Sequence, residues 1–309
     1  MRDRRIVVAR RWTGLGDCLV SLLAAHRYAK ATNRALVIDW RFTAYAPSDN
    51  LFALAFTAPM VWDGVATEVV DAGRGFEISG PTWPIGWTGA MLADAPVAGE
   101  RCNHAQVVER IASGADVAAP VVVFDGCIAP LAPDAPTSRR LLSSLRVRDD
   151  VRDAVERFVR ERFAGRPTVG VHVRHGNGGD IGTHAPYWHR PGQALLAIAD
   201  DVRAAVAALT QESDTPPVVF LSTDSGEIEA MLRRVLPGVV TWPKRFRPAG
   251  AGELHLGSNA VEGFVDALVD MLLLGEVDRL VRFPPGSAFS FWGFVMSGRR
   301  EHRGSGPRS

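Results

Sequence analysis

The sequence predicts an α/β fold in which parallel strands alternate with helices. Short runs of β-branched residues recur along the chain, bounded by Gly, Pro or Asp, and segments with helical spacing of apolar residues separate them. This alternation is typical of βαβ units whose helices cover both faces of a parallel sheet. The chain has 309 residues, about twice the roughly 150 residues of one domain. We therefore expect two domains of similar size.

The first half begins with a strand, a helix and a second strand, predicted over residues 5–9, 17–32 and 35–40. Both strands are short and nearly all apolar, as buried parallel strands are. Residues 41–118 contain scattered Trp, Pro and Gly with little periodicity, so the sequence predicts no order of elements there. A further buried strand is predicted at residues 120–125, where three valines precede Phe124.

The second half repeats the alternation. A helix is predicted over residues 149–162, where opposite charges four residues apart, such as Glu156 and Arg160, support helical structure. Beyond a Gly-Arg-Pro-Thr segment, further strands and helices are predicted at residues 168–174, 193–209, 217–223, 226–235, 239–242, 261–274 and 279–283. Because Gly and Pro mark the break, we expect domains over 1–165 and 166–298. The Arg-, Gly- and Ser-rich residues 299–309 are expected to form a disordered tail.

Composition excludes several classes of function. The 35 Lys and Arg nearly balance the 34 Asp and Glu, for a net charge of +1, so there is no basic excess to bind nucleic acid or anionic lipid. Three widely spaced cysteines without a CxxC pair support neither a disulfide framework nor a zinc site. No apolar run approaches the roughly 18 residues of a membrane span, and the N-terminal run is too short for a signal peptide. We expect a cytoplasmic protein without a nucleic-acid partner or membrane span.

A glycine pair follows the first predicted strand and opens the first helix. Gly14, Leu15 and Gly16 stand where backbone amides and the helix dipole favour a bound anion. A dinucleotide fingerprint needs a third glycine at the position of Leu19, which weakens an NAD-binding interpretation. Taken alone, this loop is also explained by a tight turn that requires glycine.

The strongest signal follows the predicted strand at residues 168–174. There His172, Arg174, His175 and Asn177 occur with three glycines, at the carboxyl end of a strand, where open α/β sheets bind ligands. Strand alternation places His172 and Arg174 on one side, and the arginine fork suits two phosphate oxygens. The alternative is a buried histidine satisfied by a carbonyl beside a salt-bridged arginine, but loop glycines add nothing to a packed core.

Asp224 ends another predicted strand, in the segment Ser-Thr-Asp-Ser at residues 222–225. Capping of the next helix is the favoured interpretation, and a contact from Asp224 to a ribose hydroxyl is compatible with it.

Three carboxylates, Glu262, Asp266 and Asp270, lie four residues apart on the helix predicted at 261–274, opposite its apolar stripe. Such a row is usually solvated. Because these like charges repel one another, we expect a facing cation or a ligand donor for at least one of them. Downstream, residues 282–289 turn a strand into a helix through Pro, Gly and Ser, which predicts a second helix start suited to an anion.

These motifs together resemble the nodulation fucosyltransferase family. The similarity includes Gly-Val-His-Val-Arg-His-Gly-Asn-Gly at residues 170–178 and further segments at residues 10–18, 37–40, 180–181, 184–188, 223–225, 243–246, 267–271 and 282–285. It extends in order from about residue 5 to residue 290. Members of that family transfer fucose from GDP-fucose in α-1,6 linkage to the reducing-end GlcNAc of chitin oligosaccharides, and they are related to the eukaryotic N-glycan core fucosyltransferases.

The resemblance implies a GT-B-like arrangement of two Rossmann-type domains facing a cleft, with inverting transfer that needs neither metal nor cofactor. The N-terminal domain would serve the acceptor, an oligosaccharide or small glycoside, and the C-terminal domain would bind the GDP-sugar donor. Arg174 would hold the β-phosphate and stabilise the departing GDP, with His175 beside it. His172 and Asp270 would meet the guanine, the carboxylate accepting from its N1 and N2 donors.

Further donor contacts are implied for Asn177 and for Asp224, which would lie near the nucleotide. Gly14, Leu15 and Gly16 would pass along the phosphates, and Ser287 with Phe289 would close the other side of the site.

The sequence departs from the family where members carry a Glu in the loop after the strand at 168–174. That position is Gly179 here, next to Asp180. We take Asp180 as the candidate general base, with His184 as the alternative. The chain also stops soon after Phe294, where relatives continue. Two other hypotheses follow, a transferase for another GDP-sugar or acceptor and a GDP-sugar-binding protein without catalytic activity. The acceptor, the donor sugar and the oligomeric state are not determined by these residues.

Overall fold

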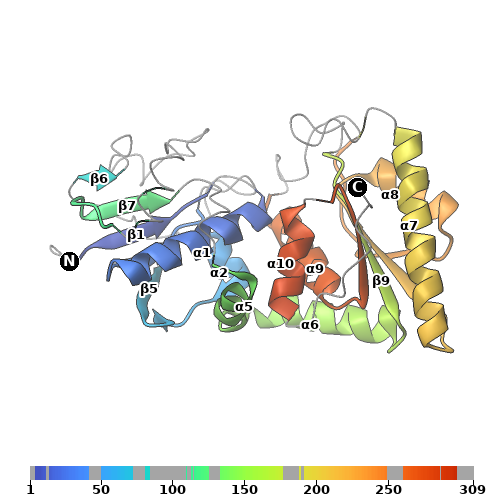
Figure 1. The fold of residues 1–309 in the computed structure, drawn as a ribbon, viewed down its shortest axis with the longest axis horizontal. Helices are drawn as coiled ribbons and strands as arrows, with labels where there is room; N and C mark the ends of the chain where they lie inside the picture. The colour runs from blue at the N-terminus through green and yellow to red at the C-terminus, as the bar shows by residue number, and fades with distance from the viewer. Residues whose placement is uncertain are drawn as a thin grey trace. The chain divides into compact units, whose positions relative to one another are not determined.

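The computed structural model describes residues 4–11, 14–41, 50–71, 81–83, 109, 113, 115–124, 133–176, 188, 191–248, 260–285 and 287–297. The chain divides into two compact units (Figure 1). The first comprises Met1–Arg148 and Asn259–Phe264, and the second comprises Asp149–Ser258 and Val265–Ser309. Residues 299–309, for which the sequence predicts a disordered tail, lie outside the described part of the chain.

The first unit is built on a six-stranded sheet in the order β4-β5-β2-β1-β7-β6. Its strands are β1 (Ile6–Ala9), β2 (Ala35–Ile38), β4 (Val61–Trp62), β5 (Val65–Val69), β6 (Thr82–Trp83) and β7 (Val121–Phe124). All neighbours pair in parallel except β4 with β5. The central strands are short apolar runs that pack around Val8, Val37 and Val123, which explains why sequence pattern identifies them.

Helix α1 (Leu15–Ala31) links β1 to β2 and is buried along most of its length. Smaller elements in the described part of the unit are α2 (Leu51–Ala55), β3 (Phe56–Thr57), α5 (Ala135–Ser143) and β8 (Arg146–Val147), with β3 and β8 antiparallel. Asn50 caps α2 by accepting from Phe52 N, and Asp134 caps α5 by accepting from Thr137 N at 2.8 Å. The structure therefore orders parts of residues 41–118, for which the sequence predicts no arrangement.

The second unit contains a four-stranded, fully parallel sheet in the order β11-β10-β9-β12. The strands are β9 (Thr168–Val173), β10 (Val218–Thr223), β11 (Val240–Thr241) and β12 (Arg279–Phe283). Its described helices are α6 (Asp149–Phe158), η2 (Val159–Phe163), α7 (Pro191–Glu212), α8 (Gly226–Val235), α9 (Ala260–Gly275) and α10 (Ala288–Ser297), and the first residues of α9, up to Phe264, belong to the first unit. The predicted alternation of this half is confirmed, with small shifts at the ends of elements.

Helices cover both faces of the second sheet (Figure 1). On one face, Val171 and Val173 join the core formed with Ile198 of α7 and Ile228 of α8. On the other face, a Cβ on Gly170 would lie 2.8 Å from the side chain of Val277.

Helices α9 and α10 pack backbone to backbone. A Cβ on Gly293 would lie 2.2 Å from the Met271 carbonyl oxygen, and one on Gly275 would lie 2.5 Å from the Gly293 carbonyl oxygen. No real Cβ atom approaches backbone so closely, so glycine at both positions fixes α10 against α9.

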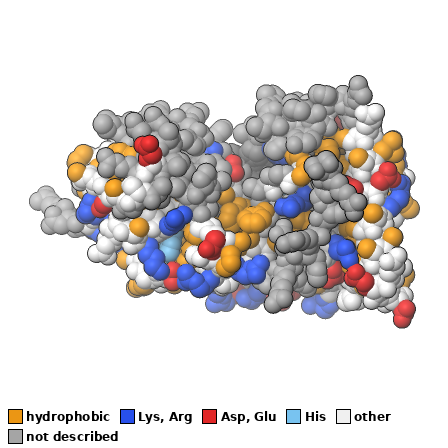
Figure 2. All heavy atoms as spheres, viewed as in Figure 1, with side chains coloured by type: hydrophobic (Ala, Val, Ile, Leu, Met, Phe, Trp, Pro, Cys, Tyr) orange, Lys and Arg blue, Asp and Glu red, His pale blue; other side chains and the backbone are white. Residues whose placement is uncertain are grey.

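Among the described residues, no helix is long and apolar enough to cross a membrane. Positive and negative side chains occur on the same face of the molecule (Figure 2), as the net charge of +1 leads one to expect.

Candidate functional site

A row of polar side chains crosses the second sheet near the carboxyl ends of its strands. Arg282 of β12 and Ser222 of β10 are both in register with His172 of β9. Residues paired in a parallel ladder point to the same face of the sheet, so three polar side chains share this face. Val171 and Val173 point to the other face and join the core, as strand alternation predicts.

Asp270 of α9 meets this row as a buried carboxylate. Its side chain is only 4% exposed, and its Oδ2 accepts a hydrogen bond of 2.9 Å from Ser222 Oγ and an ion pair from Lys244 Nζ. Within the described residues, Asp270 Oδ1 is buried and has no hydrogen-bond partner. Burial raises the pKa of Asp270, and Lys244 and Ser222 oppose that rise. The site thus holds an acceptor oxygen for a ligand that donates.

Lys244 is a cation that faces the acidic row, as the sequence predicts. The Lys244 side chain, paired with Asp270, is 5% exposed, and its Nζ lies 5.6 Å from the centroid of the Phe246 ring. The solvated-face interpretation of the row is therefore wrong at Asp270, because the helix turns that position toward Ser222 and Lys244. It holds at Glu262, which is exposed. Asp266 is half-buried and accepts from Trp242 Nε1 at 2.8 Å.

His172 is a buried, neutral histidine. The side chain lies 3.2 Å from Ser290 Oγ through Nδ1, and its ring is tilted against Phe289 with centroids 5.1 Å apart. Burial lowers the pKa of His172 to about 3, with Asp224 opposing and Arg174 and other cations reinforcing the shift. A neutral imidazole offers one donor and one acceptor, so His172 is suited to contact an uncharged base rather than a phosphate.

Arg174 forms an ion pair with Asp224, in which the side chains are 22% and 12% exposed. The same carboxylate accepts from the backbone N–H groups of His175, at 2.8 Å, and Gly176, at 2.9 Å. Asp224 therefore fixes the loop after β9 and orients the guanidinium. The capping role belongs to the next residue, because Ser225 Oγ accepts from Ile228 N at 3.4 Å and begins α8. Arg174 is therefore salt-bridged, as the alternative interpretation expects. The ion pair lies at the carboxyl end of the strands, where the sequence predicts a ligand.

His175 is 8% exposed and packs edge to face against Trp188, with centroids 4.7 Å apart. Trp188 in turn donates from Nε1 to the Arg174 carbonyl oxygen at 3.0 Å. His175 Nδ1 is buried without a hydrogen-bond partner in the described part of the chain. Gly176 follows with φ of +75°, a left-handed conformation that favours glycine and turns the chain away from the strand.

Gly14, Leu15 and Gly16 lie in the first unit, at the start of α1. Gly14 precedes the helix without a side-chain cap, and its carbonyl oxygen accepts from Asp17 N and Cys18 N, each at 3.1 Å. This confirms a strand, glycine turn and helix in that order. The remaining described site residues all belong to the second unit.

Ser287 precedes α10 and Phe289 belongs to its first turn, which confirms the predicted helix start. Ser287 is 9% exposed. Asn177, Asp180 and His184, together with Gly179, lie outside the described residues.

Sequence analysis did not assign three residues that complete the site: Ser222, Lys244 and Ser290. Lys244 lies in the segment at 243–246 that carries the family resemblance, and the acidic row already required a cation. The serines gave no signal, because pairing between strands or helices decides which serine reaches a buried group. Among the described residues, no group of three or more His, Cys, Asp or Glu is placed to hold a metal ion.

Two α/β units with parallel sheets, one of which gathers arginine, neutral histidine and a buried carboxylate at its strand ends, correspond to a GT-B-type glycosyltransferase. The chain belongs to the NodZ family, nodulation protein Z, whose family model matches residues 3–301. Nodulation protein Z of Sinorhizobium fredii is 37% identical over 293 residues, which cover 93% of this chain and 89% of the relative.

Solved structures agree with this assignment. The crystal structure of fucosyltransferase NodZ from Bradyrhizobium has a TM-score of 0.75 at 28% identity, covering 94% of this chain and 92% of that one. NodZ α-1,6-fucosyltransferase soaked with GDP-fucose has a TM-score of 0.73 at 28% identity, covering 95% and 92%. The predicted fold and the family resemblance are confirmed.

Proposed function

We propose that this protein is a fucosyltransferase that moves fucose from GDP-fucose, in α-1,6 linkage, to a sugar hydroxyl. Similarity to NodZ over nearly the whole chain supports the reaction class. The observation that carries the proposal is the unpartnered Oδ1 of buried Asp270. Guanine presents two adjacent N–H donors, at N1 and N2, to such a carboxylate. Adenine presents no comparable pair, so this oxygen selects a guanine nucleotide.

The donor is held along the carboxyl edge of the second sheet. Asp270 accepts from the guanine, and His172 contacts it as a neutral ring. Arg174, oriented by Asp224, holds the β-phosphate. Asn177 and the start of α10, with Ser287 and Phe289, complete the donor site in the second unit.

The reaction inverts the anomeric carbon in one displacement. The acceptor oxygen forms a bond to that carbon while the bond to the β-phosphate oxygen breaks, and GDP leaves with the electron pair. Arg174 stabilises the charge that develops on the β-phosphate, and His175 supports it from the adjacent position. The hydroxyl proton passes to Asp180, the candidate general base. No metal enters this scheme, because Arg174 and the helix starts supply the positive charge.

We infer that residues 1–165 serve the acceptor and residues 166–298 the donor. The acceptor is an oligosaccharide or small glycoside, and nucleic acid is not a partner. A cytoplasmic location is supported by three widely spaced cysteines without a CxxC pair, because such cysteine usage suits a reducing compartment.

Calorimetry with GDP and IDP tests the donor assignment, because IDP lacks only the 2-amino group. We expect the wild type to prefer GDP by about tenfold, the value of one hydrogen bond to a charged group at about 1.4 kcal/mol. Asp270→Asn should lose that preference, whereas Glu262→Gln, which changes an exposed carboxylate of the same row, should keep it. Equal affinity of the wild type for GDP and IDP would contradict the assignment.

A transfer assay tests the reaction itself. GDP-fucose with chitin oligosaccharides should yield GDP and a fucosylated product, with GDP-mannose and small glycosides run as competing donor and acceptors. Transfer from GDP-mannose alone would indicate another GDP-sugar. Tight GDP binding with neither transfer nor donor hydrolysis would indicate a binding protein.

A further inference from the structure

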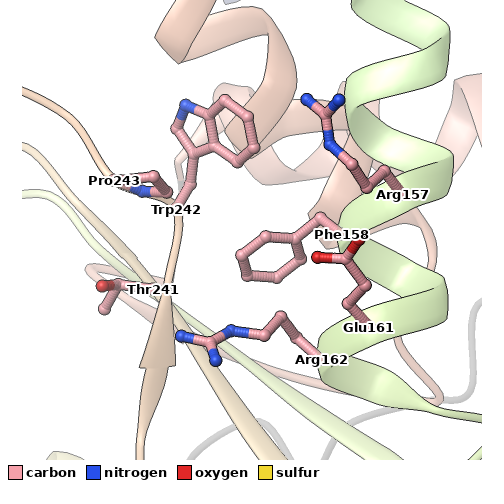
Figure 3. A pocket seen from close by; sticks show the side chains of 7 residues that line it. All are labelled: Arg157, Phe158, Glu161, Arg162, Thr241, Trp242 and Pro243. Atoms are coloured by element: carbon pink, nitrogen blue, oxygen red, sulfur yellow. The ribbon is translucent and has the colours of Figure 1, made fainter.

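The second unit contains a cavity of about 480 Å³ that the proposed donor site does not use. Arg157, Phe158, Glu161, Arg162, Thr241, Trp242 and Pro243 line it, from α6, η2, β11 and the residues after β11 (Figure 3). This volume lies within the range of about 300–1,000 Å³ found for small-molecule sites. Its lining combines aromatic rings with charged groups, which is the composition of a ligand site rather than of a packing defect.

The π-helical turn η2 brings the lining residues of α6 and η2 to one side of the helix. Phe158 and Phe163 are five residues apart, yet both pack against Phe220 with centroids 5.7 Å away. In an α-helix, residues five apart lie about 140° apart around the axis. A π turn, whose hydrogen bonds join residues five apart, brings such pairs together. Arg157 and Arg162 have the same spacing and both line the cavity.

The two arginines carry charge that this unit does not neutralise. Both side chains are exposed, and within the described residues neither has an ion pair or hydrogen bond. Figure 3 shows their guanidinium groups on opposite sides of the Phe158 ring, with that of Arg157 beside Trp242 and with Glu161 on the same helix. Arg152, one and a half turns earlier on α6, instead pairs with Asp149, at 3.0 Å. The cavity thus holds two unpaired cations and one unpaired carboxylate.

Trp242 forms a fixed aromatic wall. Its Nε1 donates to Asp266 at 2.8 Å, and its ring contacts Phe158 edge to face with centroids 5.8 Å apart. A tryptophan held in this way presents an apolar face at little cost in side-chain entropy. Such faces stack against the C–H groups of a sugar ring.

We propose that this cavity is a second ligand site that binds an anionic sugar, a sugar ring bearing a phosphate, sulfate or carboxylate group. Arg157 and Arg162 hold the anion, and the ring stacks on Trp242. Glu161 accepts hydrogen bonds from the sugar hydroxyls. The net charge of +1 from these three ionised side chains favours a ligand with one negative group and hydroxyls over a simple anion.

Nitrogen-15 labelling of tryptophan provides a local readout of this site, because the Trp242 indole signal is assigned by its loss in Trp242→Phe. The protein is saturated with GDP so that added anions do not compete for the donor phosphates, and the titration is repeated without GDP. The probes are glucose 6-phosphate, glucose 6-sulfate, glucuronate, glucose and inorganic phosphate. At least one anionic sugar should shift the Trp242 signal, with affinity about tenfold or more above that of glucose or phosphate, or about 1.4 kcal/mol.

Two variants test whether the arginines that line the cavity bind the anionic sugar. Arg157→Ala with Arg162→Ala should weaken the anionic sugar by tenfold or more. Arg160→Ala, which removes an exposed arginine of the same helix that does not line the cavity, should leave it unchanged. Thermal unfolding verifies that both variants fold.

Three results would overturn the proposal: no movement of the Trp242 signal with any probe, phosphate as effective as the sugar phosphate, or equal losses in the two arginine variants. None depends on the proposed transferase activity, because the signal is read with and without GDP and involves no turnover.

Discussion

The carboxyl ends of the two sheets both carry a buried aspartate beside cations, yet only one of these clusters is complete. In the first unit, Asp39 is fully buried. Its Oδ1 accepts from Arg41 Nε at 2.8 Å, and its Oδ2 accepts from Arg41 Nη2 at 3.0 Å and lies 3.7 Å from Arg10 Nη1. In the second unit, both protein partners of Asp270 contact Oδ2, and Oδ1 has none in the described residues.

This difference separates a structural ion cluster from a binding site. A buried carboxylate whose two oxygens are both paired holds its neighbours in place and has no oxygen left for a ligand. A buried carboxylate with one unpaired oxygen costs free energy in the empty protein, and a ligand that donates to it recovers that cost. We therefore expect changes at Asp39 to act on stability, and changes around Asp270 and Arg174 to act on binding and turnover.

The largest effect should follow from Asp39→Ala. This variant leaves Arg10 and Arg41, which are 3% and 4% exposed, without their shared carboxylate. Breaking a buried ion pair in this way costs about 3–5 kcal/mol, so chemical denaturation should show a loss of that size. Asp63→Ala is the matched control, because Asp63, 24% exposed, also pairs with two cations, but these are Lys30 and Arg140, whose side chains are 54% and 57% exposed. That variant should lose about 1 kcal/mol or less, and equal losses would show that the buried cluster is not special.

Next in size is the effect of Arg174→Ala on turnover. The guanidinium lies at the strand end where we place the β-phosphate, and removing one stabilising group of this kind costs about 10²–10³ in kcat. The variant should remain folded, because the Arg174 side chain is 22% exposed. Arg203→Ala, which removes an exposed arginine paired with Asp200 on α7, should turn over normally. Wild-type rates in Arg174→Ala would remove this residue from the mechanism.

The fold of the second unit followed from sequence because its signals are local. Strand β9 is an apolar run ending in Gly and polar residues, and α8 begins with a serine cap at Ser225. Residues 41–118 gave no such signal, since β3, β4 and β6 are two residues long. Strands β3 and β6 form by pairing with strands far along the chain, β8 and β7, and β4 forms by pairing with β5 across a two-residue turn.

Sequence predicts those parts of the candidate site in which a single residue type carries the chemistry. It does not predict the parts that depend on two residues far apart in the chain coming into contact. Arg174 and His172 stand out by alternation along one strand. Lys244 reaches Asp270 across 26 residues of sequence, and Ser290 reaches His172 across 118. Spacing along the chain cannot show such contacts, although repulsion within the acidic row predicted a cation or a ligand donor for at least one of its carboxylates.

A pH-dependent effect should come from His172. Its pKa is about 3 in the folded protein against 6.5 as the ordinary value, so below pH 6.5 the unfolded chain takes up a proton that the folded protein does not. Stability is then highest above pH 6.5 and falls as the pH decreases toward 3, by at most about 1.4 kcal/mol per pH unit. Denaturant unfolding between pH 7 and pH 5 should lose about 2 kcal/mol through this group. His172→Gln should remove that part of the slope, and an unchanged slope would mean that His172 is protonated in the folded protein.

The smallest effect should come from Ser290→Ala. This variant tests whether the polar cluster of the second unit contributes to ligand binding or only to stability. Ser290 Oγ is the hydrogen-bond partner of His172 Nδ1 and is fully buried. Loss of one neutral hydrogen bond costs about 1 kcal/mol of stability, close to the cost of many substitutions outside any site.

GDP affinity is the more informative measurement. The imidazole of His172 also packs against Phe289, with centroids 5.1 Å apart, so it keeps its place when the Ser290 hydroxyl is removed. Its tautomer is then no longer fixed. If Ser290 acts by orienting a His172 that contacts the guanine, calorimetry on Ser290→Ala should show weaker GDP binding at unchanged pH, and Ser290→Ala should cause no further loss when added to His172→Gln. Additive losses in the double variant would mean that Ser290 affects GDP binding independently of His172, and would contradict this role.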